Sequence, residues 1–500
     1  MQQCVVWWIK RDARLTDNPA LHAAIATGLP VVPLFVFEPS VLGSAEYSST
    51  HAHAQSGAIR HIREELKVLG ANCLVFHCEC EHAFTLLSEK ILVERVFSTE
   101  ETGPETTFSR DRRMGTWFKK HRMQWTEVTQ GGTVRNSHNR EHQAVLRLAH
   151  YAEAPLAAPA QLLPLPKELC VFSSQSIPSL EELQFEPGRH QLQRISEADA
   201  ASTLVSFLGK RGSGYRYRIS SPATAFNSGS RLSAHLAWGT ISARSIFHQL
   251  REVERLALPE SSRAKDLQAF RARLHWRDHF MQRLESAPWM EHYPLNPLFS
   301  DLPYRDDSEE YLKAWLTGRT GFPMIDACMR CLSFTGFLNF RMRAMVTSFA
   351  THALRLDWKT INAPLGALMY DYEPGIHISQ VQMQAGVTGI NALRVYSPAK
   401  QLIDQDPSLL FVRKWLPEIA NIKNEDVFLA KNGHVPGYIV PIVSFADETK
   451  LMKDALYARK KSPDNVNVSS EIVQKFGSKL GRRKRVSRKK QAVIHTVLKE

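Results

Sequence analysis

Long apolar runs, paired cysteines and internal repeats are scarce in this chain. No apolar stretch approaches the roughly 20 residues that a membrane-spanning helix needs. The six-residue run Cys4–Ile9 precedes Lys10-Arg11-Asp12, an order and a length that do not fit a signal peptide. Seven scattered cysteines in 500 residues indicate a reducing compartment rather than a disulfide scaffold. We therefore expect a cytoplasmic protein with no membrane partner.

Acidic residues are missing from one segment near the C-terminus. Between Ile472 and Lys490 the chain carries nine bases and no acid, and without them the net charge of +13 falls to +4. The bases are Lys475, Lys479, Arg482, Arg483, Lys484, Arg485, Arg488, Lys489 and Lys490. Such a tail suits contacts with nucleic-acid phosphates, although a solvated arm without a partner has the same composition.

Strand-like and helix-like patterns alternate over the first 130 residues. The candidate strands are 5–9, 30–37, 72–77, 95–98 and 124–128, and helical stretches between them include 56–69 and 81–92. Alternation at this spacing predicts a doubly wound parallel sheet covered by helices on both faces. Asp17-Asn18-Pro19 has the form of a helix start, with a side-chain cap before a proline at the first helical position.

A length of 500 residues predicts two to four domains. We expect an α/β domain at 1–130 and an interdomain linker at 131–200, where "APLAAPAQLLPLPKE" is rich in proline and alanine. Helical periodicity predicts an all-α domain at 201–440. Residues 441–500 are expected to form a C-terminal extension with the basic tail.

Two stretches suggest ligand-binding loops. In "WWIKRDARLTDNPAL", residues 7–21, a buried strand runs into a charged loop that opens a helix, which is a common ligand-binding edge in doubly wound sheets. In "NSGSRLSAHLAWGTIS", residues 227–242, small hydroxyls and free backbone N–H groups stand at the entrance to a helix. They suit phosphate oxygens, and they equally suit an ordinary serine-capped helix.

The stretch "DYEPGIHISQVQMQ", residues 371–384, sets acids, a histidine, a serine and glutamines among apolar side chains. It has neither the period of an exposed helix nor the alternation of a half-buried strand. Arg343 and Asp371 are candidates for a buried ion pair, either beside a ligand or purely structural. Cys328 and Cys331 lack further cysteines to complete a four-ligand site, so we expect one helical face and no metal or iron–sulfur cluster.

From about residue 3 to 440 the chain resembles the photolyase/cryptochrome superfamily. The blocks that carry the resemblance are "WWIKRDARLTDNPAL", "SGSRLSAHLAWGTIS", "HWRDHF", "GRTGFPMIDACMR", "DWKTINAPLGALMYDYE" and "RVYSPAKQ" followed by "WLPEIA". The resemblance implies an antenna-type α/β domain and a helical domain that holds FAD in a U-shape. It also implies that residues 371–384 wrap the flavin and adenine rings, with polar groups at the ring edge and apolar contacts on the faces.

The same resemblance implies individual contacts. The cofactor-binding residues are expected to be Tyr217, Gly229, Ser230, Arg231, Leu232, Ser233, Arg277, Arg343, Asp371, Glu373 and His377. Trp276 and Arg277 match the floor of the substrate cavity. His377 lies where photolyases usually carry an asparagine beside flavin N5, and a histidine can also exchange a proton near neutral pH.

Several positions depart from the family pattern. Of the usual three-tryptophan electron relay only Trp358 matches, since Val381 and Arg305 occupy the other two positions. Tyr304, Tyr370 and Tyr372 are candidate substitutes, or simply packed rings. In the lesion cavity, Arg273 replaces the glutamate of cyclobutane-dimer photolyases and Phe340 their asparagine. The histidine of (6-4) photolyases is absent too.

The leading hypothesis is a FAD-dependent, blue-light-absorbing DNA photolyase, with Trp276, Arg273, His377 and Trp358 as candidate catalytic residues. Its partner would be ultraviolet-damaged DNA, which suits the basic charge, and a monomer is expected. The alternatives are a cryptochrome-like photoreceptor and a flavin-binding interaction protein without photochemistry. A second, antenna chromophore is expected near residues 97–114, and it could be a folate, a deazaflavin or a flavin.

Overall fold

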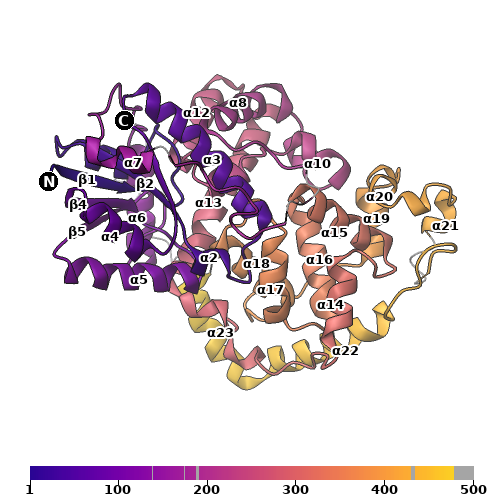
Figure 1. The fold of residues 1–500 in the computed structure, drawn as a ribbon. Coiled ribbons are helices and arrows are strands. Elements are labelled where there is room, and N and C mark those ends of the chain that lie inside the picture. Colours follow the sequence, from indigo (N-terminus) through magenta and orange to yellow (C-terminus); the bar gives the residue numbers. More distant parts are fainter. Residues whose placement is uncertain (138, 174, 187, 189–190, 429–433, 478–500) are drawn as a thin grey trace, which may run out of the picture.

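A computed structural model describes residues 1–477 except 138, 174, 187, 189–190 and 429–433. A five-stranded sheet lies in the N-terminal part of the chain and helices form the rest (Figure 1). The strands are β1 (Gln3–Trp8), β2 (Val31–Phe37), β3 (Leu74–His77), β4 (Leu92–Thr99) and β5 (Gln124–Val128). All pairs are parallel, in the order β3-β2-β1-β4-β5, which confirms the predicted sheet.

The first group of helices accompanies the sheet and the second group forms the larger helical part. The first group is α1 (Pro19–Ile25), α2 (Pro39–Leu42), α3 (Ser49–Val68), α4 (Cys80–Ser88), α5 (Glu105–Lys120), α6 (Arg140–Ala152) and α7 (Cys170–Ser173). The second group is α8 (Glu197–Ser206), α9 (Tyr215–Arg218), α10 (Pro222–Ser228), α11 (Ser233–Ala237), α12 (Ala243–Leu256), α13 (Ser262–Ser286), α14 (Ser308–Leu316), α15 (Pro323–Thr335), α16 (Phe340–His352), α17 (Trp358–Ala367), α18 (Pro374–Ala385), α19 (Pro398–Gln405), α20 (Leu410–Trp415), α21 (Asn424–Phe428), α22 (Phe445–Lys461) and α23 (Pro463–Phe476).

The side chains of β1 show how both faces of the sheet are covered. Val5 and Trp7 belong to a core shared with α1 and α3, whereas Val6 and Trp8 belong to a core shared with α4 and α5. Successive side chains of a strand alternate between faces, so a strand buried on both faces has a continuous apolar sequence. This is why the short run Cys4–Ile9 forms a strand.

Helix α1 begins as predicted. The Asn18 side chain accepts a hydrogen bond from the Leu21 backbone N–H at 3.0 Å, and Pro19 occupies the first helical position. The cap satisfies one of the N–H groups that a helix start leaves free, and the proline has none to satisfy. The loop before α1 is thereby fixed at the carboxyl end of β1.

Helix α18 lies inside the helical part, with α13, α16 and α17 packed against it. Side chains on every side of α18 are buried, among them His377, Ile378, Val381 and Gln382. A helix enclosed on all sides needs no polar face, so its sequence shows no amphipathic period. The stretch 371–384 is irregular in pattern for this reason, although it is mostly helical.

Helical structure continues beyond the segments with clear periodicity. Within 131–200, where the composition favours a linker, α6 packs its Tyr151 ring 5.1 Å from Phe247 of α12. At the C-terminus, α23 lies against α13. Arg140 donates a hydrogen bond to the Gln474 carbonyl and Arg283 donates one to the Phe476 carbonyl, each at 3.1 Å. Positive side chains suit the negative end of a helix. The predicted basic tail from Lys479 onward lies outside the described residues.

Within the described part of the chain, no helix combines the length and the apolar character that crossing a membrane would require.

The sheet and the helical part meet tightly at Gly239, after α11. Arg14 donates a hydrogen bond to the Gly239 carbonyl at 3.0 Å, and Gly239 has a φ of +75°. A Cβ at this position would lie 2.0 Å from the Arg11 carbonyl oxygen, which is backbone and cannot turn aside. Only glycine allows the two chain segments to approach this closely.

We predict that Gly239→Ala forces the two parts apart and lowers the free energy of unfolding by about 3 kcal/mol or more. Gly28→Ala is the matched control, because Gly28 has a similar φ of +74° but no atom within 4 Å of its would-be Cβ. That control should cost only about 1 kcal/mol. Denaturant unfolding of both variants measures the difference, and equal losses would contradict the close contact.

Candidate functional site

The predicted ion pair between Arg343 and Asp371 forms. The guanidinium of Arg343, on α16, lies 2.9 Å from the carboxylate of Asp371, in the loop before α18, and Asp371 is largely buried. Arg343 also donates to the Leu338 carbonyl at 2.6 Å. The pair therefore fixes the start of α18 against α16.

Arg231 is a second cation beside this pair, and it has no ion-pair partner among the described residues. Its guanidinium lies between the rings of Phe226 and Phe337, 4.0 and 4.1 Å from their centres. Burial lowers the pKa of Arg231 to about 10, and its Nη1 has no hydrogen-bond partner. A largely buried cation without a direct ion-pair partner is costly, so this position suits a bound anion.

Other buried polar atoms without partners lie on the elements that the resemblance assigns to the cofactor. They are Ser228 Oγ at the end of α10, Asn362 Oδ1 on α17, and Ser379 Oγ and Gln380 Nε2 on α18. Buried donors and acceptors normally have partners, and leaving one unmade costs about 1–3 kcal/mol. Together with Arg231 they fit a large ligand with an anionic centre and polar ring edges, as FAD is.

The turn before α11 differs in part from the prediction. Gly229 is buried and Leu232 is 1% exposed, but Ser233 is exposed and Leu232, not a serine, occupies the N-cap without a side-chain hydrogen bond. Tyr217 is 72% exposed, so it does not line a buried ligand. The one-turn helix α9 buries its neighbour Tyr215 instead, because the two side chains point in different directions.

His377 is held as a neutral imidazole. Its Nε2 lies 2.7 Å from the Asn362 carbonyl, so Nε2–H donates, and burial lowers the pKa of His377 to about 4. Burial therefore opposes the charged imidazole that the expected proton exchange near neutral pH would need. The Tyr372 ring lies 5.3 Å from the His377 ring.

Glu373 and Arg277, both predicted site residues, form an ion pair with each other. Arg277, on α13, lies 2.8 Å from Glu373, and Arg11, from the loop after β1, lies 3.5 Å from the same carboxylate. Arg11 also donates to the Tyr372 carbonyl at 2.6 Å. The sequence did not indicate that Arg11 pairs with Glu373, because the two residues are 362 positions apart.

Trp276 and Arg273 lie one helical turn apart on α13. The Trp276 side chain is 40% exposed and its ring stacks on Phe280 at 5.6 Å. Arg273 is exposed and forms a hydrogen bond with the Tyr215 hydroxyl. The two side chains thus present an indole and a guanidinium on one surface of α13, which itself packs against α18.

The expected electron relay rests on Trp358 alone. Trp358 is 1% exposed in the main helical core, and it has no aromatic neighbour among the described ring pairs. Arg305 forms an ion pair with Glu448 at 2.9 Å, and Val381 is buried in the same core as Trp358. A role for Trp358 in electron transfer stays a prediction.

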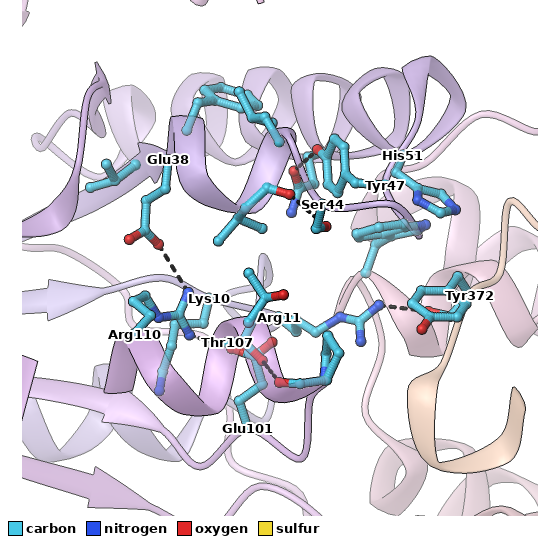
Figure 2. Close-up of a pocket in the computed structure, with 18 of the residues that line it drawn as sticks. Lys10, Arg11, Glu38, Ser44, Tyr47, His51, Glu101, Thr107, Arg110 and Tyr372 are labelled. Atoms are coloured by element: carbon cyan, nitrogen blue, oxygen red, sulfur yellow. Dashed lines mark hydrogen bonds and ion pairs between the residues drawn. The ribbon is translucent and has the colours of Figure 1, made fainter. Parts of the chain in front are cut away.

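A cavity opens where the carboxyl ends of the strands meet the helical part (Figure 2). Its volume is about 740 Å³ with its mouth included. Glu38, Glu101 and Arg110 lie at one end in Figure 2, and Tyr47, His51 and Tyr372 lie at the other. Ligands of doubly wound sheets bind at this edge. Glu101, Thr107 and Arg110 come from the stretch 97–114 that was expected to border an antenna chromophore.

Cys328 and Cys331 lie on one helix, α15. Both are buried free thiols, and burial raises the pKa of both. Over the described ranges, no group of three or more His, Cys, Asp or Glu side chains is arranged to hold a metal ion.

Comparisons with known proteins identify the family. A family model of DNA photolyase matches residues 5–143, and a model of the FAD binding domain of DNA photolyase matches residues 270–458. The chain is 24% identical to a deoxyribodipyrimidine photo-lyase of Synechococcus over 92% of this chain and 97% of that protein. It is 26% identical to a cryptochrome DASH of Gloeobacter violaceus over 88% of this chain and 89% of that protein.

The fold is also that of an archaeal photolyase from Sulfolobus tokodaii, with a TM-score of 0.76, 24% identity and coverage of 91% and 99% of the two chains. That structure contains two FAD molecules, and its description implies a novel light-harvesting cofactor. The chain belongs to the photolyase/cryptochrome superfamily and contains its FAD-binding domain.

We predict that Arg231→Met lowers FAD retention at least about tenfold, because a cation expected to bind an anionic group of the cofactor is lost. The FAD-free protein should at the same time be as stable as the parent or more so, since an unpaired buried charge is removed. Arg330→Met is the control: Arg330 is ion-paired with Glu418 at 2.7 Å, so its loss should leave FAD content unchanged. Full FAD content in Arg231→Met would contradict the assignment.

A second prediction concerns pH. The pKa of His377 is about 4 in the folded protein and about 6.5 in the unfolded chain, so the unfolded state binds more protons between these values. The free energy of unfolding is therefore not reduced by His377 above about pH 6.5. As the pH falls toward 4, protonation of His377 in the unfolded chain lowers this free energy by up to about 1.4 kcal/mol per pH unit.

His377→Asn should reduce the slope of unfolding free energy against pH by the share of His377, and it should also shift the flavin absorption bands. His352→Asn is the matched control, because burial also lowers the pKa of His352 to about 4 on α16. It should reduce the slope of unfolding free energy against pH equally, without changing the flavin spectrum. Identical spectra of the two variants would contradict a position of His377 beside the flavin.

Proposed function

We propose that the protein is a light-dependent lyase that repairs a pyrimidine photoproduct in DNA. The observation that carries the proposal is the surface of α13, where Trp276 and Arg273 stand exposed above the helix-enclosed segment that fits FAD. Bound reduced FAD would supply the electron on absorbing blue light. This chain's residues would bind the lesion, orient it and exclude water.

The exposed indole of Trp276 would stack on an extruded base, and the guanidinium of Arg273 would contact an adjacent phosphate. Extruding a base costs a few kcal/mol, and least at a weakly stacked lesion, so selectivity for damage follows. Below this surface, the Arg343–Asp371 pair would hold the flavin edge, with His377 as a neutral neighbour.

Arg273 and Phe340 would give the proposed lesion-binding surface a cationic and an apolar component. A guanidinium stays charged, so Arg273 does not donate a proton as the family's glutamate does. Phe340 is 51% exposed at the start of α16. Repair of cyclobutane dimers is therefore expected to be less efficient than in family members that keep the acid.

The second candidate function is a cryptochrome-like photoreceptor, and a specific observation favours it. The lesion-site glutamate is absent, and the buried Trp358 has no ring neighbour in the described structure to continue a relay. For either function, the cavity of Figure 2 is proposed to hold a second chromophore. A monomeric state and a cytoplasmic location stay predictions.

We predict that Trp276→Ala weakens binding to irradiated DNA by about 1–3 kcal/mol, roughly 5- to 150-fold, and leaves binding to intact DNA nearly unchanged. Trp289→Ala is the matched control, because Trp289 is equally exposed at 43% but lies beyond the end of α13. Binding is measured at several salt concentrations, followed by a repair assay under blue light. Equal affinity of the parent for both DNAs, with no repair, would reject the lyase in favour of the photoreceptor.

A further inference from the structure

The last described helix brings the chain back to the junction between the sheet and the helical part. Figure 1 shows α22 and α23, in yellow, running along the lower edge of the helical part toward α6 and α13. There Arg140 of α6 donates to the Gln474 and Gly477 carbonyls, and Arg283 of α13 donates to the Phe476 carbonyl. The point at which the chain leaves α23 is therefore fixed by two cations.

The cations at this edge of α13 have no acidic partners. Arg283 is 4% exposed, burial lowers its pKa to about 10, and its Nε and Nη1 have no hydrogen-bond partner. Arg140 and Arg273 form no ion pair with any described residue either. The only negative groups at Arg283 and Arg140 are the last carbonyls of α23. The edge therefore carries positive charge that the described protein leaves largely unneutralised.

A row of side chains along α13 joins the end of α23 to the proposed lesion-binding surface. The Arg283 guanidinium lies 5.4 Å from the centre of the Phe280 ring, and Phe280 stacks on Trp276 at 5.6 Å. Arg273 follows one turn further along the helix. Positions three and four apart share one helix face, so these four side chains form a single row. About five residues of extended chain would cover the path from Phe476 to Trp276.

The sequence that follows α23 is strongly basic. Between Lys479 and Lys490, outside the described residues, the basic tail carries eight lysines and arginines and no acid. Its first base comes only three positions after Phe476. Because the edge of α13 is positive as well, like charges oppose docking of the tail on that edge itself. A polyanion, in contrast, is attracted by the edge and the tail together.

We propose that α23 places the basic tail beside the row on α13, where the tail binds the DNA phosphates that flank the lesion. The inference rests on the proposed function and adds a second surface to it: Trp276 and Arg273 bind the lesion, and the tail binds the neighbouring backbone. Since Arg140 and Arg283 fix the origin of the tail, its bases stay at high effective concentration on one side of the lesion. Phosphate contacts position the duplex without reading its sequence.

A variant with all eight bases of the tail replaced by glutamine tests the phosphate contacts. Its binding to a duplex that carries one photoproduct is measured in the dark at several salt concentrations. Each phosphate contact contributes about 0.9 to the slope of log affinity against log salt concentration, so we expect the slope to fall by at least about 3. An unchanged slope overturns the proposal, and so does tail-dependent binding to phosphatidylglycerol vesicles without any to the duplex.

Arg140→Met combined with Arg283→Met tests the anchor while leaving the tail intact. The affinity for the same duplex should fall at least about fivefold, because the effective concentration of the tail at the flanking phosphates is lower. Arg63→Met combined with Arg459→Met is the matched control. These two arginines also donate to backbone carbonyls, at 3.0 and 3.1 Å, but away from the end of α23, so the same charge is removed without loosening the tail.

Hydroxyl-radical footprinting shows where the tail lies on the DNA. In the parent, protection should extend further on one side of the photoproduct than on the other, and both the glutamine variant and the anchor variant should lose this excess. A symmetric footprint in the parent, or equal losses of affinity in the anchor and control variants, overturns the anchored position.

Melting temperature and FAD content of each variant establish that it is folded. All readouts are binding in the dark, so tail-dependent protection of DNA without any repair would reject only the lyase. Repair by the parent, with parental affinity and salt slope in the glutamine variant, would reject only the role of the tail. The two proposals therefore fail separately.

Discussion

The ion pairs that Glu373 makes with Arg11 and Arg277 hold the two parts of the molecule together. Arg11 lies in the loop after β1, Arg277 lies on α13, and Glu373 directly precedes α18. The Glu373 carboxylate lies 3.5 Å from the Arg11 guanidinium and 2.8 Å from that of Arg277. All three side chains are mostly buried, and breaking such a buried pair typically costs about 3–5 kcal/mol. Together with the close contact at Gly239, this carboxylate fixes the sheet edge relative to the start of α18.

Because α18 starts at this junction, the residues around its start contact both the cavity at the sheet edge and the predicted flavin site. Tyr372 lines the cavity at the sheet edge, and its ring also contacts His377 at 5.3 Å. His51, from α3, stacks on Tyr372 from the cavity side. A chromophore in the cavity and a flavin beside His377 would thus be separated by a few packed rings, which suits energy transfer between them.

The two sites have opposite electrostatic characters. In the helical part, Arg231 has no ion-pair partner among the described residues, which suits an anionic ligand. In the cavity, Arg110 and Lys10 are already ion-paired with Glu38, Glu101 and Asp111.

The sequence determined the elements that arise from local chemistry. The apolar runs predicted the parallel strands, and Asn18 and Pro19 predicted the start of α1. The sequence blocks, in their order along the chain, identified the superfamily. Only the tertiary structure decided what surrounds each side chain. It paired Arg277 with Glu373, exposed Tyr217, lowered the pKa of His377 and left Arg231 unpaired. Each of these depends on partners and burial contributed by segments far away in sequence, which local periodicity does not encode.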